Sequence, residues 1–176
     1  MSGVLAMQTA EVFYFGDVSF KIESAHRLHR QFGDRLRADG QIRLNLDRLV
    51  HLEQEVSEAM RSMGMFELCA ECGSQPPGGC CSATMANETD AMLLLINLCA
   101  GLEASPIRDD DHECRFLGAA GCSLKFKPFV CLNYLCRQIQ SQSSSEQLAR
   151  LQGTTSEFLS QLLVVEELIQ GQLAPE

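Results

Sequence analysis

Cysteines are the side chains of this sequence with the richest chemistry, and all nine lie between Cys69 and Cys136. Eight of them fall into two groups by spacing: Cys69, Cys72, Cys80 and Cys81 form the first, and Cys114, Cys122, Cys131 and Cys136 form the second. The ninth, Cys99, stands alone in an apolar run. We expect Cys99 to be a small buried hydrophobic residue rather than a ligand, because cysteine is among the most buried residue types.

The spacing within the two groups is typical of metal ligands. Cys69 and Cys72 form a CxxC, in which the intervening turn can aim backbone amides at both sulfurs and stabilise them as anions. Cys131 and Cys136 are close enough in sequence to share a centre, and Pro128 stiffens the approach to them. Metal binding is therefore the chemistry that this stretch predicts.

The compartment that we expect favours a metal over disulfides. The first fifteen residues lack a basic segment, a sustained apolar segment and a cleavage site, so they do not read as a signal peptide. The apolar run at 91–96 is too short to span a bilayer. We expect a cytoplasmic protein, and in a reducing cytosol nine thiols are not expected to form a disulfide framework.

Three thiol chemistries compete. Structural zinc usually takes two separated CxxC knuckles, and only one is present. An iron–sulfur cluster accepts looser spacing, and eight cysteines suffice for one cluster or for two metal centres. Redox catalysis by Cys69 and Cys72 would call for a thioredoxin-like βαβ setting, which the sequence does not suggest. An iron–sulfur cluster, of the [4Fe–4S] type, is preferred, with zinc as the alternative.

The second group lies in a run that contains Cys114-Arg115-Phe116-Leu117, Gly121-Cys122, Lys127-Pro128, Cys131, Tyr134 and Cys136. This run resembles the C-terminal signature of the YkgJ-like cysteine-cluster proteins, whose domain is described as zinc- or iron-chelating; flagellin lysine N-methylases carry a similar cluster. The family's first signature, CxxCGxCC, is matched in order by Cys69, Cys72-Gly73 and Cys80-Cys81, with a gap longer by five residues. Leu132 replaces the arginine expected after Cys131. The resemblance covers about residues 67–137 and implies that all eight cysteines of the two groups are ligands.

Charge limits the partners. The net charge is −9; residues 1–48 carry seven basic and six acidic side chains, whereas the remainder carries seven basic and seventeen acidic ones. An acidic body is unsuited to nucleic acid or anionic lipid, because both require a positive field. We expect a protein partner, no nucleic acid and no membrane.

The elements around the cysteines predict a mainly α fold in one domain, 1–176, made of a hairpin and helix (1–66), a loop-rich cysteine lobe organised by metal (67–137) and a helical C-terminal segment (138–176).

Alternation at 11–22 about Gly16-Asp17 predicts a short N-terminal β-hairpin. Three- and four-residue steps predict a helix at 41–63 that ends at Gly64. Residues 73–79 must form a loop because they hold two prolines and three glycines.

A further helix is expected from a cap at Asn87 to Gly101. Two capping boxes, at 143–146 and 154–157, predict one helix or a pair that ends at Gly171 and packs on the helix at 41–63. A homodimer through the hairpin or the C-terminal helix is a minor alternative.

Two other groups of polar residues are weaker candidates. His26 and His29 can share a helix face, but a solvated basic face explains them better. The acidic turn 109–113 lacks the ligand spacing of a calcium loop, so a solvated turn or a docking patch is expected.

No recognisable catalytic set or phosphate loop is present. The function predicted is a metal-binding protein, most simply iron–sulfur, that acts in electron transfer or as an accessory to a partner enzyme. The alternatives are a lysine N-methylase-like enzyme, although no donor-binding Rossmann segment is recognisable, and a zinc-stabilised interaction module.

Overall fold

The computed structural model describes residues 13–74, 79–108, 113–119 and 121–174. This part of the chain is mainly helical, with one short antiparallel sheet of two strands. No described helix combines the length and apolar character needed to cross a membrane.

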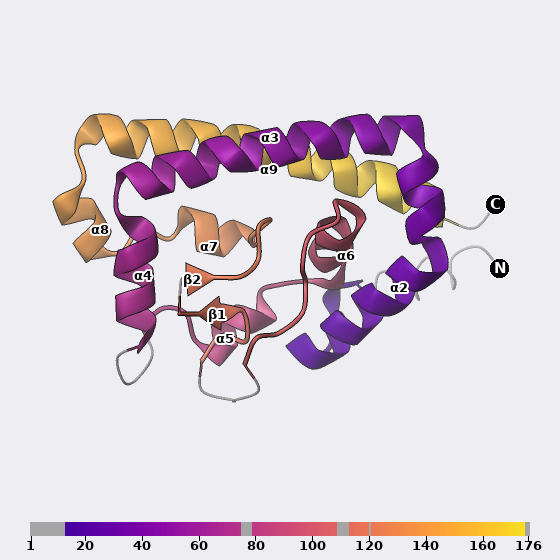
Figure 1. Cartoon of the computed structure of the whole chain (residues 1–176), viewed down its shortest axis with the longest axis horizontal. Coiled ribbons are helices and arrows are strands. Elements are labelled where there is room, and N and C mark those ends of the chain that lie inside the picture. The colour runs from indigo at the N-terminus through magenta and orange to yellow at the C-terminus, as the bar shows by residue number, and fades with distance from the viewer. Residues whose placement is uncertain (1–12, 75–78, 109–112, 120, 175–176) are drawn as a thin grey trace.

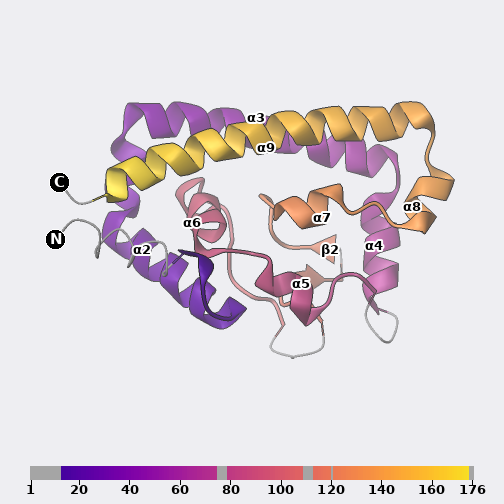
Figure 2. The same ribbon diagram turned by 180° about the vertical axis from the view of Figure 1, so that it is seen from behind.

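Two long helices form the spine of the molecule. Helix α3 (Gly40–Ser62) and helix α9 (Ser145–Leu173) lie side by side along one edge in both views (Figures 1 and 2). Both bury residues at three- and four-residue steps, as in Leu46 and Leu49 of α3 and Phe158 and Leu162 of α9. The predicted helix at 41–63 and its packing against the C-terminal helix are confirmed.

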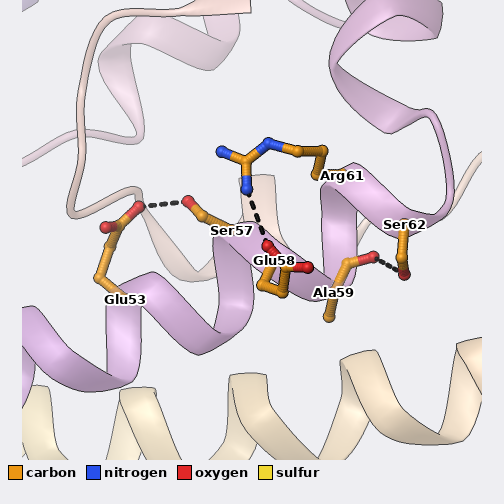
Figure 3. A network of polar contacts seen from close by, with 6 residues as sticks. All are labelled: Glu53, Ser57, Glu58, Ala59, Arg61 and Ser62. Carbon is orange, nitrogen blue, oxygen red and sulfur yellow. Dashed lines mark hydrogen bonds and ion pairs between the residues drawn. The ribbon is translucent and has the colours of Figure 1, made fainter.

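The polar residues of α3 are satisfied within that helix at its C-terminal end. Figure 3 shows the Ser57 hydroxyl donating to Glu53, the Arg61 guanidinium pairing with Glu58, and the Ser62 hydroxyl donating to the carbonyl of Ala59. These contacts join residues three or four apart, which face one another on a helix. The buried Glu53 is therefore a structural residue and not a free carboxylate.

Helix α9 is longer and more continuous than the sequence suggested. Its capping box is formed by Ser144 and Gln147, one residue beyond the box expected at 143–146. The second box, at 154–157, does not exist, because the Thr154 hydroxyl donates back to the carbonyl of Arg150 inside the helix. Neither Gly153 nor Gly171 ends the helix.

The N-terminal β-hairpin prediction is wrong in the described part of its range. Gly16 does take a positive φ of 94°, as expected of a turn, but Asp17 then caps helix α2 (Val18–Ala38) by accepting a hydrogen bond from the Phe20 N–H. Val18 and Ile22 are buried, whereas Phe20 between them is 43% exposed, which is the helical period and not alternation. Residues 11 and 12 lie outside the described residues.

The shorter elements lie on one side of the spine: α6 lies next to α2, and the others lie toward the end opposite the chain termini (Figures 1 and 2). In chain order they are α4 (Met65–Ser74), α5 (Ala83–Asn87), α6 (Ala91–Cys99), β1 (Leu117–Gly118), β2 (Gly121–Cys122), α7 (Phe129–Asn133) and α8 (Arg137–Gln142). In the sheet, Leu117 pairs with Cys122 and Gly118 with Gly121. Within the range 73–79, where a loop was predicted, Gly73 and Ser74 belong to α4, and residues 75–78 are not described.

Helix α6 begins later than predicted. Asp90 caps it by accepting from the Leu93 N–H at 2.7 Å, whereas Asn87 ends α5. The Asn87 side chain instead accepts a hydrogen bond from the Val18 N–H at 3.0 Å, and its carbonyl accepts one from the Lys21 ammonium at 2.6 Å. Asn87 thus joins α5 to α2 rather than opening α6.

Candidate metal centre

One cavity of about 100 Å³ gathers the eight cysteines that the sequence singled out. The thiols reach it from α4 (Cys69, Cys72), from the segment before α5 (Cys80, Cys81), from the segment before β1 (Cys114), from β2 (Cys122), from α7 (Cys131) and from the residue before α8 (Cys136). A single water occupies about 30 Å³ of liquid. The space therefore exceeds what one small ion needs.

The two sequence groups are interleaved in this cavity. The Cys114 N–H donates to the Cys81 carbonyl at 3.0 Å, and Ser82 and Glu113 form an isolated β-bridge beside that bond. The long gap in the first group does not separate its members, although residues 75–78 lie outside the described residues.

Gly79 allows the Cys80-Cys81 pair to approach the CxxC formed by Cys69 and Cys72. It adopts a φ of +55°, and a Cβ atom built on it would lie 2.5 Å from the Cys72 sulfur. Only glycine allows the backbone to pass so close to this thiol in that conformation. The Cys80-Cys81 pair that follows is thereby carried to the cavity wall.

Burial suppresses ionisation of most of these thiols in the absence of a cation. Burial is the main cause of a raised pKa, about 11 for Cys69 and about 12 for Cys131, and neighbouring thiols contribute to both values. Cys80 is exposed, and a hydrogen bond with Cys81 lowers the pKa of Cys80 and raises that of Cys81. A bound cation would reverse this balance by stabilising the thiolates.

Backbone hydrogen bonds act on two thiols of the second group. Those from Phe116 and Leu117 oppose the rise in the pKa of Cys114 that burial causes, and the Leu117 N–H also donates to the Cys114 carbonyl at 2.9 Å. The N–H of Leu124 does the same for Cys122. Hydrogen bonds of this kind stabilise the anionic form that a metal requires.

The rest of the described lining is mainly apolar. Met60, Met65, Phe66 and Met85 contribute to it, and Lys127 is the cation among the described lining residues. An apolar shell limits the access of water to a metal centre, and water access affects the redox potential of the centre.

The donor set fits a metal that prefers sulfur. Soft thiolates select zinc, copper(I) and iron–sulfur clusters over hard cations such as magnesium and calcium. Within the described residues, no three Cys, His, Asp or Glu side chains are drawn together tightly enough to ligate one ion. The structure thus provides the donors and their enclosure, whereas coordination would require the thiols to close inward.

The other candidates from the sequence lie outside this cavity. His29 contacts Arg37 on α2, at 3.0 Å between ring and guanidinium nitrogens, and His26 is on the same helix. Cys99 is 4% exposed within the core. In the acidic turn, residues 109–112 lie outside the described residues, and Glu113 pairs with Arg108.

Sequence reasoning missed one positioning residue, Asn97 of α6. Its side chain is fully buried and bonds both backbone groups of Phe126: it donates to the carbonyl at 3.1 Å and accepts from the N–H at 3.1 Å. Phe126 lies between Cys122 and Cys131, so Asn97 holds the connection that carries both thiols. A polar residue inside an otherwise apolar helical run was the available signal.

A helical protein with a cysteine-lined cavity is the class that fold and site define. Comparisons with protein-family models, with curated proteins and with solved structures found no match to this chain. The resemblance to the cysteine-cluster family accordingly rests on the residues quoted from the sequence.

Proposed function

We propose that this protein binds a thiolate-ligated metal centre, an iron–sulfur cluster in preference to zinc, and serves in electron transfer or as an accessory to a partner enzyme. The observation that carries the proposal is the convergence of all eight thiols on one cavity from six separate segments. Structural cysteines have no reason to converge in this way, because isolated buried thiols behave as small hydrophobic groups. The ligands are Cys69, Cys72, Cys80, Cys81, Cys114, Cys122, Cys131 and Cys136.

An iron–sulfur cluster is preferred over a single zinc ion for two reasons. The cavity is larger than one ion needs, and the sequence contains only one of the two CxxC knuckles that structural zinc usually takes. When bound, such a cluster supplies a one-electron carrier whose potential depends on hydrogen bonds to sulfur and on exposure. The chain supplies the thiols, the amides at Cys114 and Cys122 and the apolar wall.

A zinc-stabilised interaction module is the second candidate. Thiolates suit zinc as well, and two large aromatic side chains at the two ends of α7 are exposed: Phe129 at 64% and Tyr134, which lines the cavity, at 57%. Aromatic residues are enriched at protein interfaces. The methyl-transfer alternative has no comparable support, since the sheet in the described residues is one antiparallel pair and not a Rossmann sheet.

Elemental analysis of anaerobically purified protein tests the proposal directly. We expect iron and acid-labile sulfide, with visible absorption that bleaches on addition of dithionite. Colourless protein with stoichiometric zinc would favour the second candidate. Protein that binds neither metal after reconstitution would refute metal binding altogether.

A matched pair of variants tests the ligand assignment. Cys131→Ser should lose metal and destabilise the central segment, because metal binding and folding are coupled at such sites. Cys99→Ser makes the same atomic change in the core and should keep the metal, at a cost of about 1–2 kcal/mol for burying a hydroxyl. Metal content per chain and thermal unfolding measure both effects, and loss of metal from Cys99→Ser would show the assignment to be wrong.

A further inference from the structure

A buried lysine lies in the wall of the cysteine cavity. Lys127 is 7% exposed, and its ammonium donates one long hydrogen bond, 3.5 Å, to the carbonyl of Lys125. Among the described residues no carboxylate forms an ion pair with it. A buried ammonium without a paired anion is costly, so its retention calls for another source of negative charge.

The backbone around this lysine is fixed. Its neighbour Phe126 is held on both backbone groups by Asn97, and the Phe126 ring packs on that of Phe158 with centroids 5.8 Å apart. The next residue, Pro128, is the N-cap of α7. The ammonium is therefore presented to the cavity by a rigid segment and not by a mobile loop.

Negative charge at this place can come from the thiols. Lys127 lines the same cavity as Cys122 and Cys131. These two cysteines stand on either side of it in sequence, on β2 and on α7. The lysine thus faces the part of the cavity where thiolates would form.

We propose that Lys127 is the charge-compensating residue of the metal centre: its buried ammonium offsets the excess negative charge that the thiolates bring into the cavity. This inference rests on the proposed function. Four thiolates around a divalent ion, or around an iron–sulfur cluster, leave a net negative charge on the centre. A fixed cation beside it stabilises the loaded form and stabilises the reduced form of a cluster more than the oxidised one.

Three variants separate charge from packing. Lys127→Met keeps the aliphatic stem and removes the charge, Lys127→Arg keeps the charge, and Lys125→Met removes the same charge from an exposed residue two positions away. Cobalt(II) is the optical probe of thiolate binding, titrated into the metal-free chain under anaerobic conditions. We expect Lys127→Met to weaken cobalt binding about 10–100-fold, the range for residues that support metal ligands.

The metal-free stability of the same variants distinguishes this role from a structural one. Without metal, Lys127→Met removes an unpaired buried charge, so its thermal midpoint should equal or exceed that of the wild type. A lysine that only held the fold together would lower both stability and affinity. Lys127→Arg should bind cobalt within about threefold of the wild type, as should Lys125→Met, because exposed charges are screened.

For protein reconstituted with a cluster, the midpoint potential is a second readout. It should fall in Lys127→Met and stay near the wild-type value in Lys127→Arg and Lys125→Met. If Lys127→Met does not fold, Lys127→Gln replaces it with the same expectations.

The outcomes separate the two proposals. Failure of the wild type to bind cobalt, zinc or a cluster overturns the proposed function. A wild type that binds, together with a Lys127→Met variant that matches Lys125→Met in affinity and potential, overturns the role of Lys127 and leaves the metal centre intact.

Discussion

Replacing Asn97 by alanine should disturb the cysteine cavity from outside it. The Asn97 amide is 0% exposed, donates to the carbonyls of Leu93 (2.9 Å) and Phe126 (3.1 Å), and accepts from the Phe126 N–H (3.1 Å). Alanine removes all three bonds. Because Phe126 is also fully buried, its backbone N–H and carbonyl would lose their partner where water cannot replace it.

The magnitude follows from those two groups. A buried donor or acceptor left unsatisfied costs about 1–3 kcal/mol, so the pair at Phe126 should cost about 2–6 kcal/mol together. The Leu93 carbonyl keeps its helical bond and adds little. Against a total stability of about 5–15 kcal/mol, this is a large fraction.

Equilibrium urea unfolding, followed by far-ultraviolet circular dichroism on the metal-free chain, measures the change. The control is Asn133→Ala, the same substitution at an exposed residue whose amide donates to the Phe129 carbonyl, and it should cost about 0.5 kcal/mol or less. Thiol-labelling rates should also rise in Asn97→Ala, because the segment carrying Cys122 and Cys131 is released. A difference between the two variants below about 1 kcal/mol would refute the view that Asn97 holds this segment.

Two further predictions concern a buried acid and a glycine. Burial raises the pKa of Glu166 to about 7, above its unfolded value of about 4.3, so its contribution to stability is complete below pH 4 and is lost as the pH rises through 7. Glu166→Gln should therefore raise the melting temperature at pH 8 and leave it unchanged at pH 4. Glu167→Gln, at an exposed residue, is the control. Equal effects of Glu166→Gln at both pH values would contradict the raised pKa of Glu166. Gly79→Ala should cost about 1–2 kcal/mol of stability because of the positive φ at this residue, and it should weaken metal binding by displacing Cys72. The control is Gly153→Ala, inside a helix with open space around it, which should be neutral or stabilising. Cobalt titration and thermal unfolding measure both variants, and undiminished metal binding by Gly79→Ala would contradict the role given to this glycine.

The long amphipathic helices were predictable because their pattern is redundant. The helix at 41–63 repeats its apolar step over six turns, so one ambiguous residue does not alter the assignment. The segment Val18–Ile22 is only five residues long, and its apolar residues fit both the two-residue period of a strand and the 3.6-residue period of a helix. The exposure of Phe20 in the structure decides for the helix. The hairpin error was therefore one of pattern length, and the capping role of Asp17 was the missed cue.

Tertiary contacts decided what the local pattern left open. Asn87 and Asp90 are both good helix caps by residue type. The choice of Asp90 follows from the engagement of Asn87 by the backbone N–H of Val18, a residue 69 positions away. A contact of that range leaves no trace in the local sequence, and the same is true of the two bonds between Asn97 and Phe126.

Sequence spacing places the eight cysteines in two groups, but in the fold both groups line one cavity. The Cys81 carbonyl accepts a hydrogen bond from the Cys114 N–H, and Cys136 lines the same cavity as Cys69 and Cys72. Two independent metal sites, one for each sequence group, would need the groups to occupy separate parts of the lobe. Because both groups line the same cavity, the proposed centre can draw ligands from both, and we expect the loss of a thiol from either group to weaken metal binding.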